Sequence, residues 1–135
     1  MKKIAIAVLF FMLIFISKDS VASDIFGYWK SDEKPPFNIV FISDEKFYSG
    51  KQKFNILRLT QDKDEYIIFI VKETYKMTEK DKKEIESLSD NEMRMRMITH
   101  ILVKKDGDNI IISTMTGKKI KYSRITKDIY NSLSN

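Results

Sequence analysis

Short runs of β-branched and aromatic residues alternate with turn signals along most of the chain, and this spacing constrains the fold more than any other feature. The strongest run is Tyr66–Val71, in which every side chain is aromatic or aliphatic. Pro35 and Pro36 remove two backbone donors, so no strand continues through them. Asp106-Gly107 supports the positive φ angles of a tight hairpin. Turns spaced about 8–12 residues apart are typical of a β-barrel or a β-sandwich.

The runs predict seven or eight short strands. Nearly every connection between them has the length of a hairpin, which favours an up-and-down meander that closes on itself over a Greek key. We therefore expect an all-β fold, a small antiparallel up-and-down β-barrel. Residues 66–71 carry apolar side chains on both faces of their strand, and we expect this strand to be covered on both sides. The expected strands start near residues 27, 37, 47, 54, 66, 93, 110 and 119.

The segment 78–92 interrupts the β pattern because it is highly charged and holds few large apolar residues. Thr78 is a suitable N-cap, and Ile85 and Leu88 are three residues apart, so we expect one short helix here. From Met93 to Val103, alternation favours a strand. The alternative is a helix capped by Ser89, with Glu92 completing a capping box.

Residues 1–23 have the layout of a secretory signal peptide. Two lysines precede an apolar run of 13 residues, Ile4–Ile16, which is shorter than the roughly 20 residues that span a bilayer. Val21 and Ser23 suit cleavage before Asp24, and cleavage after Ala22 is nearly as good. We expect an exported protein, periplasmic or secreted, with a single domain at 24–135 and no stable membrane anchor after cleavage.

Composition argues against several kinds of site. The chain has no cysteine and one histidine, His100, so neither a disulfide nor a thiolate metal site can form. The acidic groups at 62–65 and 106–108 fall in turns, where Asp is favoured for its local hydrogen bonds. Loss of residues 1–23 would lower the formal charge from +5 to +3. We expect no enzyme activity, no metal or other cofactor, and no nucleic-acid partner.

The first and last strands resemble those of the lipocalins. Near the expected mature N-terminus the chain reads Gly27-Tyr28-Trp29, and its last strand carries Arg124. In lipocalins the Trp of a G-x-W motif packs at the closed end of the barrel, and a basic residue of the last strand stacks across it. The resemblance implies that Gly27, Trp29 and Arg124 close the barrel, with a cation–π contact between its ends. The chain is shorter than a typical lipocalin, which suggests a more filled interior.

The resemblance also implies that a small apolar ligand binds in the barrel. Aromatic side chains and a stripe of methionines are the candidates for its lining, because flexible thioethers suit adaptable apolar surfaces. We therefore expect an exported, non-enzymatic binding protein. The alternative is a protein-interaction module, such as an inhibitor or envelope accessory protein, with a filled barrel and an exposed patch around 78–97. The candidate ligand-binding residues are Phe41, Phe69, Met95, Met97 and Tyr122.

Overall fold

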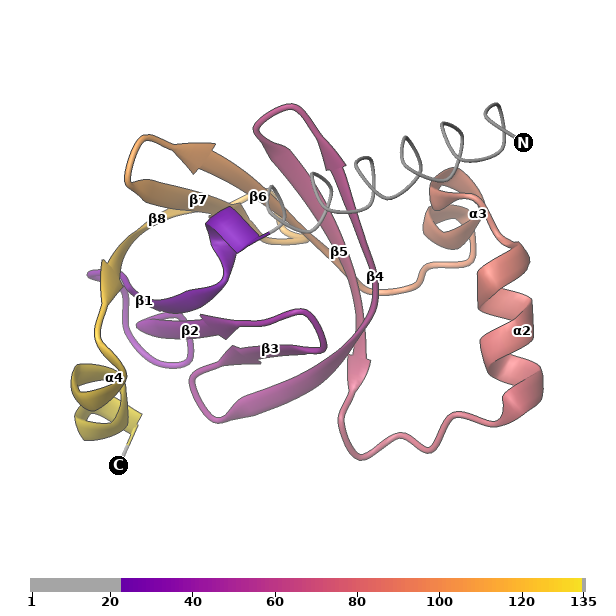
Figure 1. Cartoon of the computed structure of the whole chain (residues 1–135), viewed down its shortest axis with the longest axis horizontal. Helices are drawn as coiled ribbons and strands as arrows, with labels where there is room; N and C mark the ends of the chain where they lie inside the picture. The colour runs from indigo at the N-terminus through magenta and orange to yellow at the C-terminus, as the bar shows by residue number, and fades with distance from the viewer. Residues whose placement is uncertain (1–22, 135) are drawn as a thin grey trace, which may run out of the picture.

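The computed structural model describes residues 23–134, which form a closed eight-stranded antiparallel barrel in which each strand pairs with the next and β8 returns to β1 (Figure 1). This confirms the predicted all-β, up-and-down fold. The elements in chain order are η1 (Ser23–Ile25), β1 (Gly27–Lys30), β2 (Ile39–Ile42), β3 (Lys46–Ser49), β4 (Gln52–Asp62), β5 (Glu65–Lys72), α2 (Glu79–Ser87), α3 (Asp90–Met95), β6 (His100–Asp106), β7 (Asn109–Ser113), β8 (Lys119–Ile125) and α4 (Lys127–Ser134).

The predicted signal peptide lies outside the described residues, except for Ser23. Within residues 23–134, none of the helices has both the length and the apolar character needed to cross a bilayer.

Aliphatic and aromatic side chains fill the inside of the barrel. Tyr66, Ile68 and Ile70 of β5 point inward at alternate positions and belong to the main core. The other face of β5 is also covered, since Phe69 is fully buried in a second cluster with Leu88 and Met93. The strand is therefore enclosed on both sides, as its continuous apolar sequence predicts.

One end of the barrel is closed around Trp29, which is fully buried. The Trp29 indole N–H donates to the Ile25 carbonyl oxygen at 3.0 Å, so the short helix η1 is held against the barrel end and Ile25 is fully buried. Trp29 pairs with Arg124 of β8, and the Arg124 guanidinium lies over the indole ring at 4.3 Å. A cation over an indole face is attracted by the ring quadrupole.

Gly27 makes room for this contact. Arg124 also donates to the carbonyl oxygens of Phe26, at 2.7 Å, and Asp24, at 3.0 Å, so its side chain crosses Gly27. A Cβ at Gly27 would lie 2.5 Å from Arg124 Nη1, and the Gly27 φ of +132° disfavours any side chain. The spacing of glycine and tryptophan thus has a steric reason in this chain.

The helices α2 and α3 form an arm outside the barrel, next to β4 and β5 (Figure 1). Each helix begins with a capping box: Thr78 with Asp81, and Ser89 with Glu92. The strand predicted from Met93 is therefore wrong over 93–99, because Met93–Met95 belong to α3 and β6 begins at His100. The helix that the Ser89 capping box predicts is the one that forms. The single helix expected over 78–92 is divided in two, with Leu88 and Ser89 between the two helices.

Arg58 fastens the arm to the barrel wall. A register shift between Ile56 and Arg58 interrupts the pairing of β4 with β5. The half-buried Arg58 guanidinium donates to the Ile85 carbonyl oxygen of α2 at 2.8 Å and to Asp90 of α3 at 3.1 Å. One side chain therefore joins both helices to β4. On the opposite side of the barrel, α4 packs Tyr130 against Tyr28 and Phe41.

We expect Gly27→Ala to lower the free energy of unfolding by about 2–3 kcal/mol, because it adds backbone strain and displaces Arg124. Urea denaturation measures the loss. Gly107→Ala is the matched control, because Gly107 also has a positive φ but open space around its Cα, so only about 1 kcal/mol should be lost. In an Arg124→Ala background Gly27→Ala should cost less. Equal costs in both backgrounds would contradict the steric argument.

We expect Arg58→Met to loosen the arm while the barrel stays folded. It removes two hydrogen bonds of a charged donor, each worth about 1.5–3 kcal/mol when half-buried. Amide hydrogen exchange should therefore accelerate at least about tenfold in α2 and α3 and remain unchanged in β1, β7 and β8. Lys82→Met is the control, since it removes only an exposed pair with Glu79. Uniform acceleration over the whole chain would show that Arg58 supports the barrel instead.

Candidate functional site

The five residues predicted to line a ligand site do not meet in one cavity. Phe41 lies on the outside of the barrel in a stack with Tyr28, at 4.8 Å between ring centroids. Phe69 is also on the outside, buried under the arm. Met95 is 82% exposed on α3 and lines neither of the two hollows described below. Met97 and Tyr122 line those two hollows, one each.

The first hollow is the mouth of the barrel, at the end away from Trp29. It has a volume of about 270 Å³, with Tyr122, Phe47 and Ile112 at its floor and neutral polar side chains such as Ser49 and Gln52 at its edge. Ligand pockets usually measure about 300–1,000 Å³. The mouth is slightly smaller than that range because the core below it is filled.

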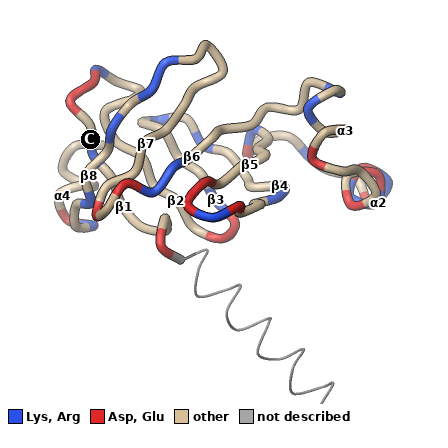
Figure 2. Tube along the Cα trace, turned by 90° about the horizontal axis from the view of Figure 1, so that it is seen from above, with Lys and Arg blue, Asp and Glu red and all other residues tan. Residues whose placement is uncertain are grey.

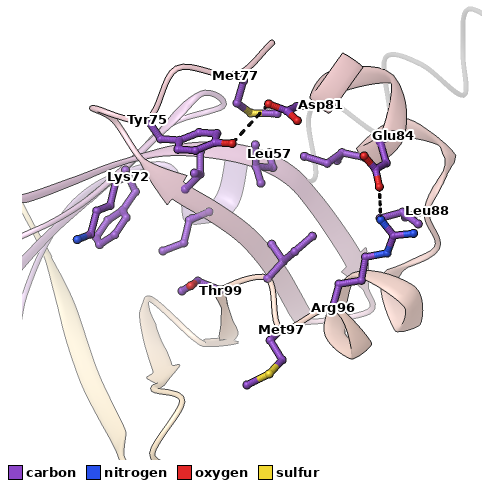
Figure 3. A pocket seen from close by; sticks show the side chains of 15 residues that line it. Leu57, Lys72, Tyr75, Met77, Asp81, Glu84, Leu88, Arg96, Met97 and Thr99 are labelled. Atoms are coloured by element: carbon purple, nitrogen blue, oxygen red, sulfur yellow. Dashed lines mark hydrogen bonds and ion pairs between the residues drawn. The ribbon is translucent and has the colours of Figure 1, made fainter. Parts of the chain in front are cut away.

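The second hollow is a groove outside the barrel, between β4–β5 and the arm. Its volume is about 520 Å³, within the usual range for ligand pockets. Figure 3 shows Leu57, Met77 and Met97 around this groove. Ile85 and Leu88 of the arm add further apolar surface. The groove is therefore mainly apolar and bounded by two adaptable methionines.

Two polar contacts tie α2 to the segments that follow β5 and α3, across the groove (Figure 3). The Tyr75 hydroxyl donates to Asp81 of α2 at 3.5 Å. Arg96, just after α3, forms an ion pair with Glu84 of α2. Together with the Arg58 contacts, they hold α2 beside the barrel although none of its own residues is buried. The arm consequently has less apolar anchoring than the strands.

The groove and the mouth adjoin. Phe54, Ile70 and Thr99 line both hollows. The pairing of β5 with β6 ends at Phe69–His100, and one further backbone bond runs from Ile70 N–H to the Thr99 carbonyl at 2.9 Å. Beyond this point the end of β5 has no β6 residue beside it. A ligand in the groove could therefore reach the mouth at the barrel rim.

Most of the charged side chains that line the groove form a hydrogen bond or an ion pair with a neighbouring residue. Hydrogen bonds from the Thr78 backbone and hydroxyl lower the pKa of Asp81, so it is ionised and occupied in the capping box. Glu84 pairs with Arg96. Lys72 differs, because its side chain forms no ion pair or hydrogen bond with the residues of 23–134. Over the trace as a whole, acidic and basic residues are interspersed (Figure 2).

The described part of the chain gathers no group of three His, Asp or Glu side chains suited to a metal ion. His100 lies at the barrel rim, 5.7 Å from the Phe69 ring, with Nδ1 3.4 Å from the Ile98 carbonyl oxygen. Its contacts within this part of the chain are those of a packed side chain, and it contacts no serine or acid there that it could activate or be oriented by.

Sequence reasoning missed most of the groove. β5 ends at Lys72, and the loop that follows brings Tyr75 and Met77 to the groove. The available signal for a covered outer face was a pair of apolar residues on neighbouring strands, Leu57 and Phe69. Each lies on a face opposite the barrel core, and such side chains must be covered by something else.

We expect alkaline pH to destabilise the fold through Tyr122. Burial raises the pKa of Tyr122 to about 12, from 10.0. The folded state therefore keeps a proton that the unfolded state loses, so the Tyr122 contribution is fully present below pH 10 and is lost as the pH rises toward 12. Tyr122→Phe should flatten this decline, measured as unfolding free energy between pH 8 and about 11.5. Tyr28→Phe is the control; an equal change in both variants would contradict the assignment.

Comparison with known proteins leaves the fold and the groove as the basis for a function: no protein-family model matches the chain, and no match to a curated protein or to a solved structure was found.

Proposed function

We propose that this chain is an exported, non-enzymatic binding protein of lipocalin-like build that takes a small apolar ligand in the groove between β4–β5 and the arm. The observation that carries the proposal is the position of the apolar space. The interior is packed with fully buried side chains, whereas the groove offers about 520 Å³ with an apolar lining.

The lipocalin-like build is supported by the contact between Arg124 and Trp29 and by the direct pairing of their strands. Export rests on the sequence of residues 1–23, which favours a periplasmic or secreted location. The absence of an enzyme activity rests on the sequence, which contains no recognised catalytic motif. This function differs from the sequence expectation in one respect: the ligand lies beside the barrel, and only its end reaches the mouth.

A second candidate is a protein-interaction module with no small ligand, an inhibitor or an envelope accessory protein. The exposed methionines favour it: Met95 is 82% exposed and Met97 85% exposed, and both lie at the end of the arm. Large flexible apolar side chains in solvent are typical of protein-binding surfaces.

The methionine methyl groups separate these functions. Met77 and Met97 line the groove, Met115 lines the mouth, and Met95 lines neither, so the chain contains its own reporters and control. We expect titration with dodecanol, followed by NMR of methyl-labelled methionine, to shift Met77 and Met97 saturably and to leave Met95 unchanged.

A shift confined to Met115 would move the ligand to the barrel mouth. Unchanged spectra up to the solubility limit of dodecanol, and of a bulkier apolar probe such as cholesterol, would contradict a small-ligand function. The protein-interaction module would then be the better hypothesis, with Met95 and Met97 as the first residues to substitute in a search for a partner.

A further inference from the structure

The groove joins the barrel mouth at Lys72, and this position indicates which kind of apolar ligand the groove would select. Lys72 is the last residue of β5 and pairs with Phe54 of β4. Paired residues share a face of the sheet, so Lys72 lies beside Phe54, a residue common to both hollows. Lys72 therefore lies at the boundary of two apolar spaces.

The charge at this boundary is not neutralised within the described residues. Of the four charged side chains that line the groove, Asp81 is held by the Thr78 capping box and Glu84 by Arg96. The nearby Glu73 is occupied too, because it accepts from the Tyr48 hydroxyl at 3.1 Å and pairs with Lys46 at 3.4 Å. These hydrogen bonds, that of Tyr48 first, lower the pKa of Glu73 and keep it ionised at neutral pH. Lys72 thus leaves one unmatched positive charge beside the apolar groove.

Because one cation at the groove, Lys72, has no anionic partner, a complementary ligand would carry one anionic group. A single Lys is a point charge with three donors, which suits a monoanion, whereas a dianionic phosphate usually draws several cationic or backbone donors. The only other cation that lines the groove, Arg96, is already paired with Glu84.

Resting on the proposed function, we propose that the groove binds linear amphiphiles with a single carboxylate, and that Lys72 holds the carboxylate where the groove meets the barrel mouth. The hydrocarbon chain then lies along the outer face of β4–β5 beneath α2, against Leu57 and Ile85. In this arrangement the ligand stays outside the packed interior of the barrel, and Lys72 determines specificity.

The test compares four ligands that share one chain and differ in the head group: dodecanoate, dodecanol, dodecyl phosphate and dodecyltrimethylammonium. Binding is measured by calorimetry at low salt, with the methionine methyl spectrum as a check of the fold. We expect dodecanoate to bind about fivefold more tightly than dodecanol, the advantage of an exposed ion pair of about 1 kcal/mol. That advantage should diminish at high salt.

Lys72→Met should reduce the affinity for dodecanoate to that of the same variant for dodecanol, and its methionine methyl spectrum without ligand shows that the variant is folded. Lys76→Met is the matched control, since Lys76 is exposed four residues along the chain and does not line the groove. It should retain the full preference for dodecanoate.

The outcomes separate the two proposals. Equal binding of dodecanoate and dodecanol, insensitive to Lys72→Met, would overturn the role of Lys72 while leaving an apolar binding function intact. Preference for dodecyl phosphate or for the cationic ligand would overturn the carboxylate assignment. Failure of all four ligands to bind would overturn this inference, and failure of cholesterol as well would overturn the proposed function.

Discussion

The barrel depends on the seam between its first and last strands. Every other strand pair joins strands that are consecutive in sequence, and most of these pairs are linked by short connections; β5 and β6, which are separated by the arm, are the exception. The β1–β8 seam must instead bring together residues about a hundred positions apart, and Arg124 does so through three contacts: the Trp29 ring and the carbonyl oxygens of Phe26 and Asp24. Without the seam, β1 and β8 would expose unpaired edges, which invite aggregation. The Arg124 bonds to Asp24 and Phe26, together with the Trp29 bond to Ile25, also hold η1 over the barrel end, so the same two side chains close both the wall and the base of the barrel.

The length of β4 explains why the apolar space lies outside the barrel. β4 has 11 residues and β5 has 8, whereas β1, β2 and β3 have 4 each. The short strands enclose a narrow interior that large side chains fill completely. The long pair presents an outer face with Leu57 and Phe69, which must be shielded from water. The arm shields it only in part, because α2 is charged and buries none of its own residues. The groove is the remainder of that incomplete cover.

The sequence predicts well where most strands and helices lie along the chain. It predicts poorly which side chains of a strand point to the barrel core. Strand positions, hairpins and the capping boxes depend on neighbouring residues, and the fold class follows from them. At β2, however, Ile39, Val40, Phe41 and Ile42 are all apolar, so alternation does not say which face is inside; Val40 and Ile42 point to the core, and Phe41 points outward to Tyr28 and Tyr130. Near Met93, the alternation of Met with Arg over five residues predicts a strand, whereas the Ser89 capping box begins a helix of six residues.

What the sequence by itself determined is therefore local: seven or eight short strands, tight turns and a charged interruption after residue 77. Only the tertiary structure determines where the apolar groove lies. The groove requires β4, the end of β5, α2 and residues 96–99 to come together, and none of these contacts has a period or a motif in the chain. A filled interior and a partly covered outer face depend on how side chains pack and on how long the strands are in three dimensions. Lys72 has its position at the groove only because β5 extends beyond the last residue that pairs with β6.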